Sequence, residues 1–268
     1  MPVHPWRRRM GLRCTRWFVV ATMGLAGCLH HPPLPTDAVA ALHEAAAGST
    51  GVDLVYEGTV RRRGAPEAPL YRYERRVLDL EEGVRSSHVT FSPAGDPVVL
   101  HQADHSPTYA LRGFHEIHTQ RGLVGQVEVL EDGTAVYETT MGGRTRTRVE
   151  APGAPLHVGP TLFGYVRTHW DSLVAGDVHP VRFVVLQKRR SYRFELQMVD
   201  GPAGTPTFAM APTDPFVALG VPSIELVFDR DRNILRYEGL VPPLDGVGDR
   251  LRTLDATVTY DLVAEEYR

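Results

Sequence analysis

The chain has 268 residues, of which 43% are hydrophobic and 23% charged, and its formal net charge is −3. This length and hydrophobic content suit a β-rich chain that folds as one unit, and the acidic balance argues against a general nucleic-acid or anionic-lipid binder. The two cysteines, Cys14 and Cys28, both lie near the N-terminus. The rest of the chain therefore has neither an intramolecular disulfide nor a cysteine-based zinc site.

Residues 1–27 have the features of a bacterial lipoprotein signal peptide. Five arginines precede an apolar stretch, residues 17–27, that is shorter than the roughly 20 residues of a membrane-spanning helix. Leu25-Ala26-Gly27-Cys28 matches the lipobox, which predicts that Cys28 carries the lipid, with acyl chains such as palmitate. An ordinary secretory signal with an accidental cysteine is the alternative, and Met10 could replace Met1 as the start.

The lipid anchor predicts where the protein lies. Leu29 follows Cys28 in place of the aspartate associated with inner-membrane retention, so we expect an outer-membrane lipoprotein of the cell envelope that faces the periplasm. Residues 28–35 form a proline-rich lipidated tether, and residues 36–268 form a single β-rich periplasmic domain. Removal of residues 1–27 leaves 24 basic and 32 acidic residues, a formal charge of −8.

The first half of the domain predicts a short helix followed by strands. Asp37 can cap a helix over residues 38–47, which ends at Gly48. Alternating apolar and polar residues then predict half-buried antiparallel strands. These strands cover residues 52–60, 70–78, 84–91, 98–102, 108–120, 124–130, 134–141 and 144–149. Residues 151–155, rich in proline and glycine, form the clearest internal break.

An amphipathic helix is predicted over residues 160–175. Apolar residues recur there at helical spacing: Leu162, Val166, Trp170 and Leu173. Pro160 suits the first turn, and Gly176 suits the left-handed position after the last turn. The period then changes to two, which predicts strands at 181–185 and 192–198 with a turn at 188–191.

The last part of the chain predicts further strands. They cover residues 205–210, 224–228, 235–237 and 254–262, with one helical turn at 214–219. The predicted fold class is therefore mainly β. It is a single antiparallel, strongly curved sheet or half-open barrel, with the helix at about 160–175 packed against it and a short N-terminal helix.

Several segments between about residue 160 and residue 262 resemble a known group of proteins. The segments are Phe163…Val166…Trp170-Asp171-x-Leu173-x-x-Gly176, Val181-x-Phe183, Tyr192-x-Phe194, Phe228-Asp229 and Leu235-x-Tyr237-Glu238-Gly239-Leu240. They are similar to uncharacterised secreted proteins and lipoproteins of proteobacteria that share a domain of unknown function. The resemblance implies an envelope protein with a mostly antiparallel β fold, and it implies no activity.

The sequence contains no strong catalytic or metal-binding motif. Two histidine pairs have spacings at which zinc ligands occur: His101 with His105, which we expect to flank a loop, and His115 with His118, which a strand would point to opposite faces. Asp229-x-Asp231-x-Asn233 resembles the start of a calcium loop but lacks its glycine and glutamate, so a polar hairpin turn explains it better. We expect no metal and no cofactor.

His169 and Asp171 are the least weak candidates for hydrolytic chemistry, together with Asp229. Residues two apart on a helix do not face each other, so we do not expect a His169–Asp171 pair. Asp171 lies near the end of the helix, where a neighbouring N–H or an arginine would compensate its charge. Trp170 is expected in the core.

Three functions remain open. The first is a non-enzymatic envelope lipoprotein that binds an apolar, lipid-like ligand or a periplasmic partner, and no nucleic acid. Its candidate ligand-binding residues are aromatic: Phe163, Tyr165, Trp170, Phe183 and Phe194. The second is a structural or assembly factor of the envelope that presents a sheet edge to another protein. The third is a hydrolase with scattered catalytic residues, which we consider less favoured than a protein without enzymatic activity.

Overall fold

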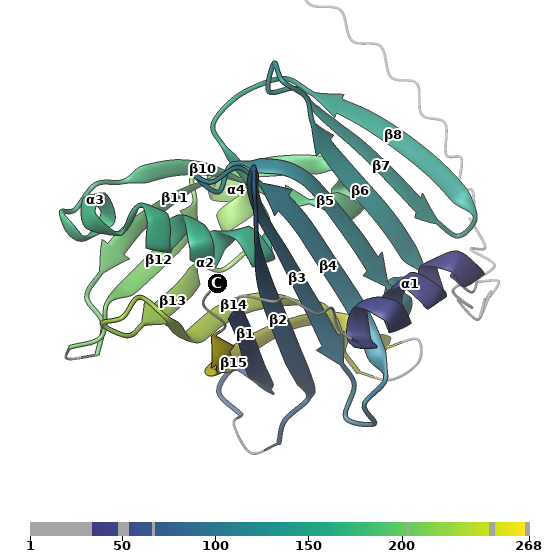
Figure 1. Cartoon of the computed structure of the whole chain (residues 1–268), viewed down its shortest axis with the longest axis horizontal. Helices are drawn as coiled ribbons and strands as arrows, with labels where there is room; N and C mark the ends of the chain where they lie inside the picture. The colour runs from purple at the N-terminus through teal and green to yellow at the C-terminus, as the bar shows by residue number, and fades with distance from the viewer. Residues whose placement is uncertain (1–33, 48–53, 66–67, 203, 247–249, 266–268) are drawn as a thin grey trace, which may run out of the picture.

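The structure, a computed structural model, describes residues 34–47, 54–65, 68–202, 204–246 and 250–265 (Figure 1). The predicted signal peptide, Cys28 and most of the tether lie outside these ranges. Within them, none of the helices is long and apolar enough to span a membrane.

Within the described ranges, fifteen strands form one continuous sheet. The strands are β1 (Leu54–Arg62), β2 (Tyr71–Leu80), β3 (Gly83–Phe91), β4 (Pro97–His105), β5 (Leu111–His118), β6 (Leu123–Val129), β7 (Ala135–Met141), β8 (Arg144–Glu150), β9 (Leu156–His157), β10 (His179–Val185), β11 (Arg190–Val199), β12 (Thr207–Pro212), β13 (Ile224–Phe228), β14 (Ile234–Asp245) and β15 (Arg252–Glu265). Every neighbouring pair is antiparallel except β9 and β10, which are parallel.

The first and last described strands, β1 and β15, lie side by side in the interior of this sheet. β1 pairs with both β2 and β15, and the strands from β1 to β8 follow one another outward to one edge. The segment at 151–155 then crosses to the opposite edge, and β9 to β15 return toward β1. The break predicted from its proline and glycine residues is therefore the crossover between the two halves of the sheet.

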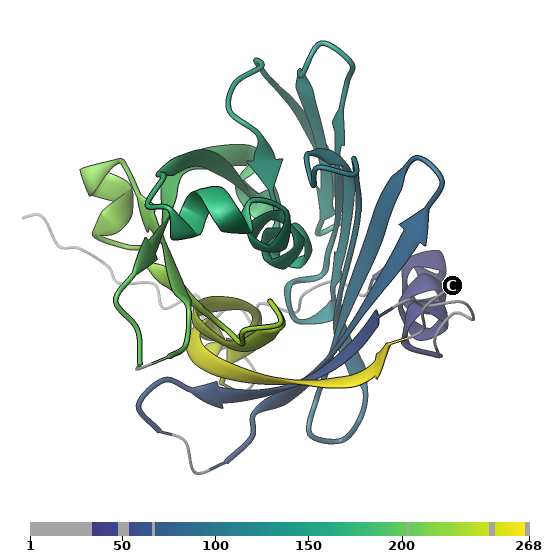
Figure 2. The same cartoon turned by 60° about the vertical axis from the view of Figure 1, so that its left-hand side comes forward.

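The sheet curls into an unclosed barrel, which confirms the predicted fold class (Figure 2). Its edge strands β8 and β9 do not pair with each other. Near this opening, the 3-10 turn η2 (Leu186–Lys188) packs against β6 at Gly125. A Cβ atom at Gly125 would lie 2.7 Å from Leu186 Cδ2, so only glycine lets the two halves approach this closely here.

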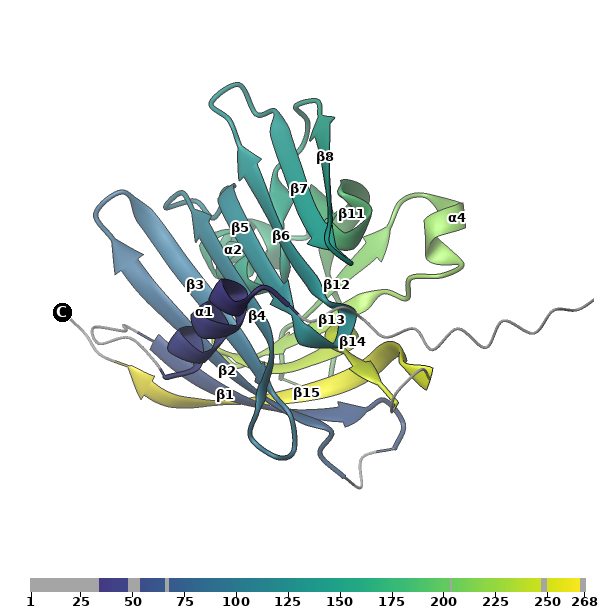
Figure 3. The same cartoon turned by 90° about the vertical axis from the view of Figure 1, so that its right-hand side faces the viewer.

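Helices cover both faces of the sheet. The N-terminal helix α1 (Thr36–Ala47) lies on the outer face, over β3 and β4 (Figure 3). Its Ala38 and Leu42 pack there in a small apolar cluster with residues of three strands: Val89, Phe91, Leu100 and Ile117. The predicted helical turn near residue 214 is α4 (Pro215–Ala218), whose first turn is capped by the Asp214 carboxylate.

The predicted helix at 160–175 is present on the inner face, but it is two helices. They are α2 (Gly159–Thr168) and α3 (Trp170–Val174), separated at His169, whose φ of −104° and ψ of 20° are not helical. The hydrogen bonds His169 N–H to Tyr165 O and Leu173 N–H to His169 O span the break. The interruption is therefore a bend. No proline or glycine marks it, which is why the periodicity predicted one helix.

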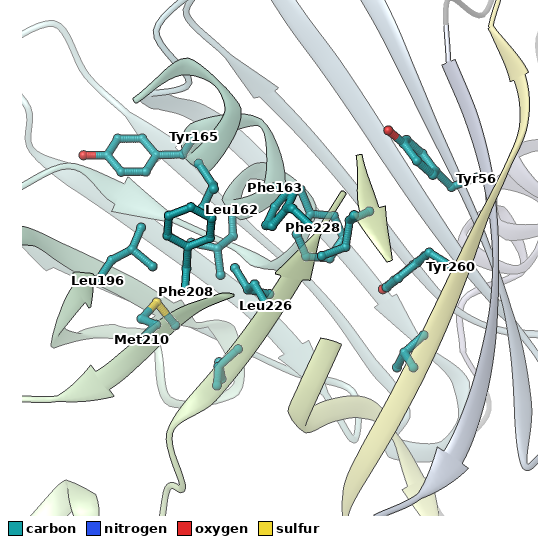
Figure 4. Close-up of a cluster of buried hydrophobic side chains, with 14 of the residues drawn as sticks. Tyr56, Leu162, Phe163, Tyr165, Leu196, Phe208, Met210, Leu226, Phe228 and Tyr260 are labelled. Atoms are coloured by element: carbon teal, nitrogen blue, oxygen red, sulfur yellow. The ribbon is translucent and has the colours of Figure 1, made fainter. Parts of the chain in front are cut away.

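The largest hydrophobic core lies between these helices and the concave face of the sheet (Figure 4). Trp170 of α3 belongs to this core, with its ring 5.2 Å from that of Phe208 and 5.7 Å from that of Phe228. Gly176, with a φ of 98°, follows α3 as predicted.

Candidate functional site

A row of polar residues crosses the concave face of the sheet. Tyr56 on β1 is opposite Arg75 on β2, Arg75 is opposite His88 on β3, and the row continues through His101 on β4 to Glu116 on β5. Residues that are directly opposite in a sheet point to the same side. Five adjacent strands therefore turn hydrogen-bonding groups toward the interior of the barrel.

Arg75 is the most unusual member of this row. Its side chain is only 3% exposed, yet no carboxylate among the described residues forms a hydrogen bond or an ion pair with it. Its Nη2 donates to the backbone oxygen of Pro160 at 3.2 Å, and its Nε has no partner. Burial lowers the pKa of the guanidinium from its ordinary value.

Aromatic rings supply the rest of the surroundings of Arg75. Its guanidinium carbon lies 5.1 Å from the centre of the Phe163 ring and 5.5 Å from that of Tyr56. Ring faces attract cations, but each contact contributes only about 0.5–2 kcal/mol. Burial of an unpaired charge costs several kcal/mol per ion. The site is therefore short of negative charge, and an anionic group would complement it.

The helix α2 covers this site, and the Arg75–Pro160 hydrogen bond is one of the contacts that hold it there. Another is Tyr109, at the tip of the β4–β5 connection, which lies flat on Gly164 and stacks on His105 with ring centres 4.7 Å apart. Pro160 presents its carbonyl oxygen where a ligand oxygen would bind Arg75.

A third contact joins α2 and α3 to β10. Tyr165 Oη lies 2.9 Å from His179 Nδ1, and His179 Nε2 lies 2.7 Å from Ser172 Oγ. A serine next to a histidine is also the arrangement of a nucleophile and its base. However, the N–H groups of residues 175, 176 and 177 all donate to carbonyl oxygens of this same helix and none is free to stabilise an oxyanion. The Tyr165–His179–Ser172 chain therefore stabilises the bend between the helices.

The other end of the polar row, unlike Arg75, has a carboxylate beside it. His101 Nε2 lies 3.7 Å from Glu116 Oε1, and His118 Nε2 lies 2.9 Å from the backbone oxygen of Pro242. Burial raises the pKa of Glu116, but the hydrogen bond and charge of His101, with smaller contributions from His118 and Arg121, outweigh it and lower that pKa overall.

The histidine pairs do not form a metal site in the part of the chain that the structure describes, where no group of three His, Cys, Asp or Glu residues could hold an ion. The expectation that His101 and His105 flank a loop is wrong. Both lie on β4 and are buried on its inner side, because that strand extends to residue 105. His115 and His118 point to opposite faces of β5, as expected.

The acidic candidates also have structural partners. Asp171 is exposed and accepts a hydrogen bond of 3.1 Å from Arg232 Nη2, which is the kind of compensation predicted for it. Asp229 Oδ1 accepts from the backbone N–H of Asn233 at 2.7 Å, in the hairpin turn between β13 and β14. His169 Nδ1 contacts the backbone oxygen of Tyr165 at 3.1 Å. No hydrogen bond or ion pair among the described residues joins His169, Asp171 and Asp229 to one another.

The predicted ligand-binding aromatics lie close to α2. Phe163, Tyr165, Trp170 and Phe194 are buried in the largest core cluster, and Phe183 packs against it partly buried. Figure 4 shows Phe163 and Tyr165 beside Phe208, Phe228 and Tyr260. Of the five predicted residues, Phe183 and Phe194 contact each other with ring centres 6.1 Å apart. The part of all five in binding a ligand stays a prediction.

The sequence analysis missed Arg75, although a signal was present. In the segment Tyr71–Leu80, alternation places Arg75 on the same side as Tyr73 and Val77, which are buried. A charged residue at a position where the alternation predicts an apolar one breaks the strand pattern, and such breaks often mark functional sites.

No protein-family model and no curated protein matches the chain. Among solved structures, it is similar to a β-barrel-like protein of domain of unknown function DUF1849 from the proteobacterium Brucella abortus. That match has a TM-score of 0.45 and 11% sequence identity, and it covers 80% of this chain and 100% of the other.

Proposed function

We propose that the protein is a lipid-anchored lipoprotein of the cell envelope that holds a lipid-like ligand inside its barrel, with the anionic head of the ligand on Arg75. Cys28 would anchor it, and the polypeptide would carry out no catalysis. The observation that supports this most is Arg75 itself, which is buried and, among the described residues, has no carboxylate partner and no hydrogen-bond partner for its Nε.

The surroundings of Arg75 explain why the ligand should also have an apolar part. The side of α2 that faces the sheet is apolar, with Leu162, Phe163 and Val166 buried. A ligand that displaced α2 would meet the same apolar surface on the sheet. An acyl chain would replace the helix side chains there, while its carboxylate replaced the Pro160 oxygen on Arg75.

The substitution Arg75→Met tests this proposal, in the chain from residue 28 onward with Cys28→Ser. We expect the affinity for dodecanoate to fall about tenfold or more, because a charge-assisted hydrogen bond contributes about 1.5–3 kcal/mol. We expect thermal stability to be unchanged or higher, because replacement of a buried charge by an apolar side chain is often neutral or stabilising. A residue with a purely structural role would instead lose stability and leave binding unchanged.

Trp170 provides the readout. Two of the three tryptophans, Trp6 and Trp17, belong to residues 1–27, so Trp170 is the single tryptophan of the tested chain. It begins α3, next to the helix α2 that the ligand would displace, so its emission should change on titration with dodecanoate. Arg76→Met, at the next position but on the opposite face of β2, is the matched control. Equal dodecanoate affinity in the two variants, or no binding to the unsubstituted chain by native mass spectrometry, would exclude the proposal.

An assembly role remains the second candidate, because β8 is an uncovered sheet edge. Six of its seven residues are exposed. An extended segment of another protein could add to this edge by backbone hydrogen bonds. Yet β8 carries Arg144, Arg146 and Arg148, and charged side chains on an edge strand commonly serve to prevent such pairing. We therefore favour the ligand-binding function.

A further inference from the structure

A cleft of about 420 Å³ lies at the opening of the barrel, away from Arg75. The strands β6, β7 and β8 form one wall, and the β10–β11 connection, with η2 at its tip, forms the other. We call it the basic cleft. Its floor includes Thr139, whose hydroxyl accepts a hydrogen bond of 3.1 Å from Arg189 Nη1 across the opening.

Three arginines line the basic cleft. Arg144 and Arg146 come from β8, where Arg144 is opposite Met141 and Arg146 is opposite Thr139. Their spacing of two residues puts both side chains on the same face of the strand. Arg189 approaches from the other wall, at a backbone φ of 50° that is uncommon for a residue other than glycine. Guanidinium groups from two separate parts of the chain therefore meet at one cavity.

No negative charge balances these arginines. None of the residues that line the basic cleft is Asp or Glu. Throughout the described ranges, none of the ion pairs involves Arg144, Arg146 or Arg189. The formal charge of −8 for the chain after residue 27 makes this local excess of positive charge more unusual. Net charge alone did not reveal it, because the acidic residues lie elsewhere.

The basic cleft also has an apolar side. Leu123 and Met141 lie opposite each other on β6 and β7, next to Arg144. Leu123 is buried, whereas Met141 is 52% exposed, which is high for a large apolar side chain. A ligand that covered Met141 would gain from removing this surface from water. The lining therefore combines cations with an apolar strip.

We propose that the basic cleft is a second binding site, for a phosphate group that adjoins an apolar portion and leaves the ligand with a net negative charge. The planar guanidinium binds phosphate through paired N–H groups, and three of them surround one tetrahedral anion better than they surround one planar carboxylate. The head group of an anionic phospholipid has this chemistry, and so does a soluble phosphate ester. The site is separate from the interior site at Arg75 and does not depend on it.

The test uses isothermal titration of the chain from residue 28 onward with Cys28→Ser. Dihexanoyl phosphatidylglycerol, its phosphatidylcholine counterpart and glycerol phosphate are the three probes. We expect phosphatidylglycerol to bind more tightly than phosphatidylcholine, and each of Arg144→Gln, Arg146→Gln and Arg189→Gln to weaken that binding about tenfold or more. Arg148→Gln is the matched control. It removes the same charge from the same exposed strand, outside the lining of the cleft, and should change affinity by less than about twofold.

The outcomes separate the possible ligands. Tighter binding of phosphatidylglycerol than of glycerol phosphate assigns the site to a lipid head group, whereas equal binding supports a phosphate site that serves soluble esters. Equal affinity for the phosphatidylglycerol and phosphatidylcholine probes overturns the proposal. An affinity that is unchanged when Arg144, Arg146 and Arg189 are all replaced by Gln also overturns it. So does a protein that binds an acidic peptide but none of the three probes. Arg75→Met should leave this affinity unchanged, so failure of the interior site does not affect the result.

Discussion

The free energy of unfolding should fall steeply as the pH drops below about 6.5, the ordinary pKa of histidine. Four of the buried histidines in the described residues have a lowered pKa: His88, His105, His118 and His157. Burial lowers the pKa of His105 and His118 to about 4 and that of His157 to about 3, and it lowers the pKa of His88 well below the ordinary value. All four are neutral in the folded protein at neutral pH.

The sign of the effect follows from where the protons bind. Above about pH 6.5, both the folded and the unfolded chain leave these rings neutral, and their contribution to stability is fully present. Between that pH and the lowered pKa values, only the unfolded chain binds the protons. Each histidine then removes up to about 1.4 kcal/mol of stability per pH unit. Because a domain has about 5–15 kcal/mol in total, we expect acid unfolding between about pH 4 and pH 6.

Urea unfolding followed by circular dichroism at several pH values measures this dependence. His157 is the best residue to alter, because it is fully buried and neither ring nitrogen has a hydrogen-bond partner. His157→Leu should reduce the slope of the free energy of unfolding against pH by the contribution of one proton, and it should stabilise the protein in acid. His43→Gln, on the exposed face of α1, should leave the slope as it is. A slope equal in all three proteins would contradict the prediction.

Gly164→Ala should destabilise the protein by about 1–3 kcal/mol, the usual cost of an overpacked site. A Cβ atom at this position would lie 1.8 Å from Cε1 and 2.1 Å from Cζ of the Tyr109 ring. Tyr109 is itself at a φ of 59°, and its ring stacks on buried His105. The ring would have to leave the helix surface, and α2 would lose one of its contacts with the β4–β5 connection.

Two further variants separate this clash from other effects of the substitution. Gly159→Ala changes the first residue of the same helix, where a Cβ atom meets nothing within 4 Å, and should be close to neutral. Tyr109→Gly removes the ring and relieves the positive φ, so Gly164→Ala should cost little in that background. Thermal unfolding of the unsubstituted protein, of Gly164→Ala, of Tyr109→Gly and of the double variant gives the coupling energy between residues 109 and 164. Additive effects of the two substitutions would show that the ring and the glycine do not interact.

Much of the fold could be predicted from the sequence because strands and helices have different periods. Most strands of the described ranges were located within a few residues, since each buries one side of an alternating pattern. The bend at His169 could not be predicted in this way. The hydrophobic stripe continues across it, and what stabilises the bend is a hydrogen-bond chain to His179, on a strand that follows the helices.

The candidate sites were less accessible from the sequence. The predicted aromatics around Trp170 lie in the largest core cluster or, for Phe183, against it, because large apolar side chains are buried wherever a helix meets a sheet. Arg75 was not identified from the sequence. Its lack of a carboxylate partner among the described residues depends on which side chains several neighbouring strands and α2 bring next to it. The basic cleft was not found either. Arg189 meets Arg144 and Arg146 only because η2 folds across Gly125, more than 60 residues earlier in the chain.

The sequence by itself determined the local structure: which segments are strands, which face of each is buried, and where turns interrupt them. These features depend on neighbouring residues along the chain, so their pattern is visible without a fold. Only the tertiary structure decided which strands became neighbours, how far the sheet closed, and which polar groups were left without partners. Those outcomes depend on contacts between distant residues, such as Pro160 with Arg75, and one sequence does not display them.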